Sequence, residues 1–162
     1  MKTMKFLLDF ILLLGIGSLT YGQIKNDIPI EKGIYFILNG NQAIEPLGPT
    51  LGNNVFLKKF NKSGMQRWEV IPQKDGSYFI RLYESELYLE PHPADERTAW
   101  LDASVSGYKI EADKNSDTNW YIKSKARKGD AMRSYSDGTF MEIRFEAAQD
   151  DKKFKWEFIK TD

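Results

Sequence analysis

Arg67-Trp68-Glu69-Val70-Ile71 has two counterparts further along the chain, Asn119-Trp120-Tyr121-Ile122-Lys123 and Lys155-Trp156-Glu157-Phe158-Ile159. In each stretch a tryptophan begins a short run of aromatic and β-branched residues, a composition typical of β-strands. A glycine turn follows the first two stretches, at Asp75-Gly76 and Lys128-Gly129. The chain is therefore predicted to contain three similar units, each closing on a tryptophan strand.

A second pattern recurs between these tryptophans. Each unit passes from a glycine through an apolar run to a glutamate: from Gly33 to Glu45, from Gly76 to Glu90 and from Gly129 to Glu142. The spacings from glycine to glutamate are 12, 14 and 13 residues. Spacings this similar in three copies indicate an internal repeat.

Each unit is predicted to hold four short strands, which makes about twelve strands with turn signals at close spacing. The middle strands are expected at residues 55–60, 108–112 and 144–148. Asn39-Gly40 and Asp137-Gly138 favour tight hairpin turns, because both residues of each pair tolerate positive φ. No apolar pattern of helical period follows residue 30. We therefore expect an all-β domain with a closed or sandwiched sheet.

The first 22 residues have the layout of a secretory signal peptide. Lysines stand near the start, residues 6–16 are mostly apolar, and Thr20 and Gly22 fit the small-residue positions before a cleavage point. The apolar run is shorter than the roughly 20 residues that a membrane-spanning helix needs. We expect an exported protein, secreted or periplasmic, whose mature domain is residues 23–162.

The composition excludes several classes of site. No cysteine is present, which rules out thiol catalysis, zinc–thiolate and iron–sulfur sites, and a lipid anchor on cysteine. Small exported domains of animals and plants are often rich in disulfides, so this composition favours a bacterial protein. The 23 basic and 23 acidic residues balance, and they provide no electrostatic reason to expect nucleic-acid binding. We expect a monomer.

The residue patterns of catalysis and metal binding are mostly missing. The single histidine, His92, lies between two prolines and has no serine in a nucleophile setting nearby. Residues 113–117 resemble a calcium loop only faintly, because the glycine and the closing glutamate of such loops are absent. We therefore expect a binding protein that is not an enzyme and that carries no metal or other cofactor.

The three units, and above all Gln66-Arg67-Trp68, resemble the Gln-x-Trp repeats of the ricin B-type lectins, which are β-trefoils. Thr118 and Phe154 replace the glutamine in the other two units. The resemblance implies repeats at about residues 31–71, 76–123 and 129–160. In that family the tryptophan packs where the three lobes meet, and a large indole at the start of a closing strand is well accommodated in a core. We therefore assign three tryptophans to the core: Trp68, Trp120 and Trp156.

The resemblance also implies where a sugar would bind. In the family, the strand end that matches Glu45, Glu90 and Glu142 carries an aspartate that binds sugar hydroxyls, and an aromatic residue on the next strand stacks on the sugar. The candidate ligand-binding set of the second unit is Glu90, Trp100, Asp102, Tyr108 and Asn115, and that of the first unit is Glu45, Phe56 and Asn61. The third unit leaves little room for a binding loop. Turn capping or a plain surface charge is the alternative role of the glutamates.

Three functions remain open. The first is carbohydrate binding by a lectin-like module. The second is protease inhibition, because Gly33-Ile34-Tyr35 resembles the Gly-x-Tyr repeat openings of the mycocypins, a family of β-trefoil inhibitors. Residues 47–54 and 91–99 would then be the loops that enter a protease cleft. The third is a scaffold that binds another protein through its surface strands.

Overall fold

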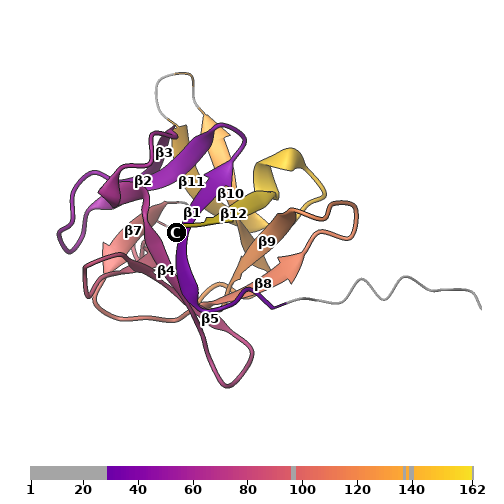
Figure 1. The fold of residues 1–162 in the computed structure, drawn as a ribbon, viewed down its shortest axis with the longest axis horizontal. Coiled ribbons are helices and arrows are strands. Elements are labelled where there is room, and N and C mark those ends of the chain that lie inside the picture. Colours follow the sequence, from indigo (N-terminus) through magenta and orange to yellow (C-terminus); the bar gives the residue numbers. More distant parts are fainter. Residues whose placement is uncertain (1–28, 96–97, 137, 139–140, 162) are drawn as a thin grey trace, which may run out of the picture.

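The computed structural model describes residues 29–95, 98–136, 138 and 141–161. The predicted signal peptide, residues 1–22, lies outside the described residues. No helix in the described part of the chain is long and apolar enough to cross a membrane. The described residues form the strands and two 3-10 helices shown in Figure 1: β1 Gly33–Asn39, β2 Gln42–Pro46, β3 Asn54–Lys59, η1 Gly64–Gln66, β4 Trp68–Pro72, β5 Tyr78–Leu82, β6 Tyr88–Pro91, β7 Ala99–Asp102, β8 Tyr108–Ala112, β9 Asn119–Ser124, β10 Asp130–Ser136, β11 Met141–Ala147, η2 Lys152–Phe154 and β12 Trp156–Lys160.

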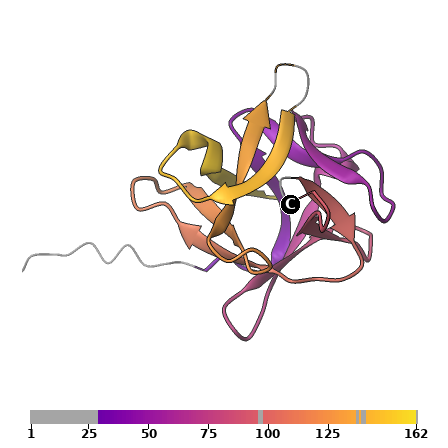
Figure 2. The same ribbon diagram turned by 180° about the vertical axis from the view of Figure 1, so that it is seen from behind.

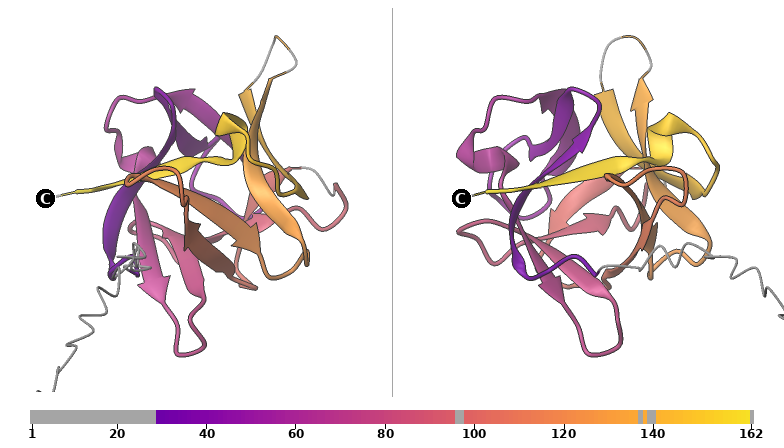
Figure 3. Two further views of the ribbon diagram at one scale, coloured as in Figure 1. Left: turned by 90° about the vertical axis from the view of Figure 1, so that its right-hand side faces the viewer. Right: turned by 45° about the vertical axis from the view of Figure 1, so that its right-hand side comes forward.

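Six strands form a closed barrel. β1 pairs with β4, β4 with β5, β5 with β8, β8 with β9, β9 with β12, and β12 returns to β1. The last strand runs beside the first, as Figure 3 shows. A closed ring leaves no strand edge exposed, which confirms the expected all-β closed architecture.

The other six strands form three antiparallel hairpins, β2–β3, β6–β7 and β10–β11. β3 pairs with both β7 and β11, so the first hairpin joins the other two (Figure 2). Each repeat therefore supplies two barrel strands and one hairpin, which is the architecture of a β-trefoil.

The strand register shows which residues of the three repeats are equivalent. We call the first strand of each repeat (β1, β5, β9) its opening strand and the last (β4, β8, β12) its closing strand. The residues that face each other on these strands are the pairs Tyr35–Trp68, Tyr78–Tyr108 and Trp120–Trp156. In the second repeat, Tyr108 therefore occupies the position that Trp68 and Trp156 occupy in the other two. Trp120 matches the tyrosines of the opening strands.

This register corrects the expected repeat boundaries. The observed repeats are β1–β4, β5–β8 and β9–β12, so the third repeat begins with the strand of Trp120 and not near residue 129. Residues 108–112 form β8, which closes the second repeat, and the third strand of that repeat is β7. Opening and closing strands both carry aromatic and β-branched runs, so composition does not distinguish them, whereas hydrogen-bond partners do.

The remaining strand and turn predictions fall close to the observed elements. The expected strands at 55–60 and 144–148 correspond to β3 and β11, which begin one and three residues earlier. Gly40 joins β1 to β2 with a φ of 62°, the positive value predicted for that hairpin turn. Asp137 of the other predicted turn lies outside the described residues.

The core follows the threefold arrangement. One layer combines an isoleucine from each opening strand with the closing-strand aromatics, and all six are fully buried: Ile37, Ile80, Ile122, Trp68, Tyr108 and Trp156. A second layer packs Val70, Ile110 and Phe158 around the opening-strand aromatics. Trp120 belongs to that second layer and is only partly buried. Apolar burial on this scale is the main stabilising contribution in a domain without disulfides.

Candidate functional site

The closing-strand aromatics bind the hairpins through equivalent hydrogen bonds. Trp68 Nε1 donates to the Ile44 carbonyl at 3.1 Å, Tyr108 Oη to the Leu89 carbonyl at 2.8 Å, and Trp156 Nε1 to the Met132 carbonyl at 2.8 Å. The residue after each acceptor is then the equivalent of the predicted sugar-binding position. These residues are Glu45, Glu90 and Arg133. The third repeat therefore carries an arginine where Glu142 was expected.

In the first repeat, Glu45 belongs to a network of protein hydrogen bonds. Lys58 Nζ lies 2.9 Å from one carboxylate oxygen, and Gln66 Nε2 donates to the other at 2.8 Å. Gln66 is fully buried, and it also donates to the Lys59 carbonyl and accepts from the backbone of Asn61. The glutamine of the Gln-x-Trp motif thus fixes the predicted binding carboxylate to the barrel.

In the second repeat, the carboxylate of Glu90 is held by the loop that precedes β8. Ser106 donates to it from its backbone at 3.0 Å and from its hydroxyl, and Gly107 N donates at 3.4 Å. Burial raises the pKa of Glu90, while these hydrogen bonds act to lower it and the charge of Asp102 raises it further. Ser106 stands two residues before Tyr108, as Gln66 stands two before Trp68.

In the third repeat, the same contact joins an arginine and an aromatic ring. The Arg133 guanidinium lies 5.6 Å from the centre of the Phe154 ring and pairs with Glu146 at 2.6 Å. Glu142 lies on β11 and pairs with Arg144 at 2.9 Å. The recurring Gly-to-Glu spacing was therefore misleading in this repeat, because it aligned a β11 residue with β2 and β6.

The predicted second-repeat set does not converge on one site. Trp100 faces Glu90 across β6–β7, but its ring packs against His92 at 4.7 Å and its buried indole N–H has no hydrogen-bond partner among the described residues. Tyr108 is fully buried in the core. Asn115 lies in the turn between β8 and β9, where its backbone donates to Asp113.

The first-repeat candidates also have separate surroundings. Asn61 accepts a hydrogen bond from the backbone of Ser63 in the turn before η1. Phe56 lines an apolar hollow of about 580 Å³, together with Leu47, Met141 and neighbouring residues of β3. We call this the apolar hollow. Gln42, Lys58 and Lys59 also line it, but Glu45 does not.

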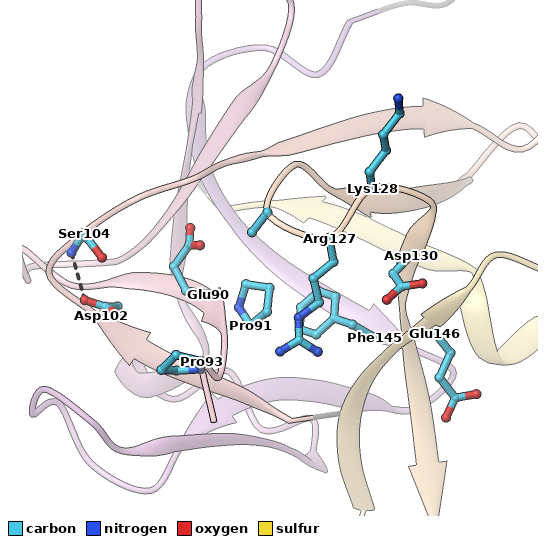
Figure 4. Close-up of a pocket in the computed structure, with 11 residues that line it drawn as sticks. Glu90, Pro91, Pro93, Asp102, Ser104, Arg127, Lys128, Asp130, Phe145 and Glu146 are labelled. Carbon is cyan, nitrogen blue, oxygen red and sulfur yellow. Dashed lines mark hydrogen bonds between the residues drawn. The ribbon is translucent and has the colours of Figure 1, made fainter. Parts of the chain in front are cut away.

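Glu90 and Asp102 are the two predicted residues that share a larger groove. This inter-repeat groove has a volume of about 870 Å³ and lies between the second and third repeats (Figure 4). The second repeat contributes Glu90, Pro93 and Asp102, and the third contributes Arg127, Asp130 and Glu146. Asp102 accepts from the backbone of Ser104 at 2.9 Å through one oxygen.

Arg127 occupies the middle of the inter-repeat groove. In Figure 4 it reaches between Pro91 and Phe145, with Asp102 and Asp130 on opposite sides. Its Nη2 donates to the His92 carbonyl at 2.6 Å, which ties the connection between β9 and β10 to the second repeat. Its Nη1 is buried and has no hydrogen-bond partner among the described groups. Buried donors are normally paired, so this N–H is an unsatisfied donor inside the wall of the groove.

Sequence reasoning missed the third-repeat side of the groove. The segment Arg127-Lys128-Gly129-Asp130 was interpreted only as a glycine turn, although three charged side chains in a tight connection were a visible signal. The residues on the other wall of the groove, among them Glu90, Pro93 and Asp102, belong to the second repeat. Among the described residues, no group of three or more His, Asp or Glu side chains could hold a metal ion.

Comparison with known proteins places the fold. No protein-family model and no curated protein matches the sequence. The Rhizoctonia solani agglutinin superimposes with a TM-score of 0.71 at 13% identity, over 83% of this chain and 99% of the other. The Macrolepiota procera ricin B-like lectin, solved with lactose, gives 0.68 at 15% identity, over 82% and 99%. The chain therefore has the β-trefoil fold that these two lectins share.

The same fold also occurs inside larger toxins. A mosquitocidal holotoxin matches with a TM-score of 0.74 at 15% identity, over 82% of this chain. The match spans 18% of the length of that toxin. A β-trefoil of this type thus stands alone in some proteins and forms one part of others.

Proposed function

We propose that the protein is an exported, non-catalytic carbohydrate-binding module whose ligand lies in the inter-repeat groove. The observation that carries this proposal is the lining of that groove, where carboxylates of two repeats surround one guanidinium. The β-trefoil fold, shared with a lectin solved with lactose, supports the ligand class. The signal-peptide pattern of residues 1–22 supports export.

The chemistry of the groove suits sugar hydroxyls, which both donate and accept hydrogen bonds. Asp102 uses one oxygen for Ser104 N, so the other can accept from a ligand, and Asp130 offers a second carboxylate on the opposite side. The Arg127 guanidinium lies between them and adds a positive charge to the wall of the groove. Pro93, which is exposed, provides apolar surface for the C–H face of a sugar ring. A volume of about 870 Å³ is in the usual range of ligand sites.

The hydrogen bonds of the Glu90 carboxylate favour sugar binding over glycoside hydrolysis. A glycosidase needs one carboxylic acid that can protonate a leaving group and a second carboxylate across the scissile bond. Burial raises the pKa of Glu90, which would suit the acid role. Both carboxylate oxygens, however, already accept hydrogen bonds from Ser106 or Gly107. The carboxyl group is therefore committed to holding a loop.

A glycan array followed by titration calorimetry tests this proposal. The purified protein is expected to bind one or more glycans, and Asp102→Asn and Asp130→Asn are each expected to weaken binding by about tenfold or more, the effect of losing a hydrogen bond to a charged group. The control is Glu86→Gln, which changes a carboxylate that is 87% exposed and does not line the groove. Absence of glycan binding, or equal affinities for all variants, would refute the proposal.

Protein binding is the second candidate, and the loop between β2 and β3 favours it. Leu47 and Leu51 in this loop are 64% and 61% exposed, and Leu47 borders the apolar hollow. Exposed apolar side chains on a projecting loop are suited to contact with another protein. The protease-inhibitor form of this candidate requires inhibition of a papain-like or trypsin-like enzyme in a standard activity assay.

A further inference from the structure

The apolar hollow shares no lining residue with the inter-repeat groove. Its walls include large apolar side chains from two repeats: Leu47, Phe56 and Leu57 of the first repeat and Met141 of the third. Leu47 is 64% exposed, and contact of a large apolar side chain with water is unfavourable. The volume of about 580 Å³ is in the usual range of small-molecule sites. The hollow is therefore suited to a largely apolar ligand.

The hollow follows strand β3 and has a polar end. Leu47 lies beside the start of β3, where its backbone N–H donates to the Asn54 carbonyl at 3.0 Å. Lys58 and Lys59 are the last two residues of the strand, and Gln42 of β2 faces Lys59. At the usual rise of a strand, the six residues of β3 span about 17 Å. The hollow thus runs from an apolar end to a cationic end.

The cationic end carries one positive charge that the protein does not neutralise. Among the described residues, none that lines the hollow is acidic. The Lys58 ammonium pairs with Glu45 at 2.9 Å. Lys59 is exposed, and its ammonium has no hydrogen bond or ion pair with another described residue. A ligand with a single negative group at one end is complementary to this arrangement.

The surroundings of β3 favour an alkyl chain over a peptide. A peptide carries a polar amide at every residue, and burying these groups against apolar side chains without partners costs free energy. Pairing with a free strand edge would avoid that cost. However, β2 occupies one edge of β3, and β7 and β11 pair with the other at residues 54–56. An alkyl chain has no polar groups that need partners.

We infer that the apolar hollow binds a medium-chain aliphatic carboxylate, with its chain on Leu47, Phe56 and Met141 and its carboxylate at Lys59. This site is separate from the proposed sugar site, and its ligand is neither a sugar nor a protein. Burial of the alkyl chain supplies most of the binding free energy. The exposed ion pair contributes less, but it selects the sign of the ligand charge.

Titration with sodium decanoate below its micelle-forming concentration, followed by methyl NMR, tests the inference. The methyl signals of Leu47, Leu57 and Met141 are expected to shift and to saturate. Decanoate should bind about tenfold tighter than hexanoate or more, because four further methylenes are at least partly buried. It should bind about fivefold tighter than decyltrimethylammonium, because Lys59 attracts the anion and repels the cation.

Two matched pairs of variants place the ligand. Leu47→Ser should weaken decanoate binding about threefold or more. Leu51→Ser should leave it unchanged, because Leu51 is 61% exposed but does not line the hollow. Lys59→Gln should reduce the preference for decanoate over decyltrimethylammonium, and Lys109→Gln, at an exposed lysine outside the hollow, should not. Thermal unfolding of each variant verifies the fold.

Several results would overturn the inference: no saturable binding of decanoate, shifts confined to methyl groups elsewhere, equal affinity for hexanoate, or tighter binding of the cation. Unchanged decanoate binding in both Leu47→Ser and Lys59→Gln would also overturn it, since the ligand would then lie at another place. None of these results affects the proposal of sugar binding, which the glycan array tests at the inter-repeat groove.

Discussion

The first and third repeats carry side chains of opposite charge at one equivalent position. In the first, Glu45 follows the carbonyl that accepts from Trp68, and Gln66 binds its carboxylate at 2.8 Å. In the third, Arg133 follows the carbonyl that accepts from Trp156, and it packs over the ring of Phe154. The charge is reversed, yet the geometry of hairpin and barrel is retained.

This difference shows what the position does in this protein. The residue two places before the barrel aromatic always contacts the residue after the accepting carbonyl: Gln66 with Glu45, Ser106 with Glu90, and Phe154 with Arg133. The contact attaches each hairpin to the barrel, whichever chemistry supplies it. Turn capping therefore describes Glu90, which accepts from the backbone N–H groups of Ser106 and Gly107, whereas Glu45 is held by side chains alone.

The largest effect is expected from the barrel aromatics. Trp68→Ala should lower the free energy of unfolding by about 3–5 kcal/mol, because it leaves a cavity at a fully buried site and removes the donor to the Ile44 carbonyl. Trp120→Ala should cost clearly less, since this indole is only partly buried. Urea unfolding followed by circular dichroism measures both free energies of unfolding. Equal losses would contradict the different burial of the two tryptophans.

An intermediate effect is expected where the hairpins are attached. Gln66→Ala removes partners of Glu45, Lys59 and Asn61 at a fully buried site, so it should cost about 1–3 kcal/mol. Ser106→Ala removes only the hydroxyl, because the backbone N–H still reaches Glu90, and about 1 kcal/mol is expected. Chemical unfolding of both variants decides the order, and a larger loss for Ser106→Ala would refute it.

The smallest effect is expected in the pH dependence of the free energy of unfolding. The raised pKa of Glu90 means that the unfolded chain releases this proton at a lower pH than the folded protein does. The contribution of Glu90 to stability therefore declines as pH rises from the ordinary value of 4.5 through the folded pKa. Glu90→Gln lacks this decline, so its stability relative to the wild type should improve with pH by less than about 1.4 kcal/mol per pH unit.

Unfolding titrations of both proteins from pH 4 to pH 8 measure this difference. The other titrating groups are shared, so the difference between the two curves isolates Glu90. Parallel curves for the wild type and Glu90→Gln would show that burial does not raise this pKa.

Much of the fold was predictable from residue types along the chain. The runs around Trp68 and Trp156 have strand composition, and both tryptophans are fully buried. Asn39-Gly40 encodes its turn locally, because Gly40 needs a positive φ. The third repeat was misaligned because the run around Trp120 has the same composition as a closing strand.

Residue types along the chain were enough to predict most strand positions, the Asn39-Gly40 turn and the burial of Trp68 and Trp156, since these depend on local conformation and on the burial of large apolar side chains. That Tyr108 stands in the place of a tryptophan could not be predicted in this way, because equivalence depends on hydrogen-bond register between distant strands. The candidate site also depends on the tertiary structure. The groove joins Asp102 to Asp130 and Arg127 across a repeat boundary, and no local pattern encodes which charged side chains of two repeats face one another.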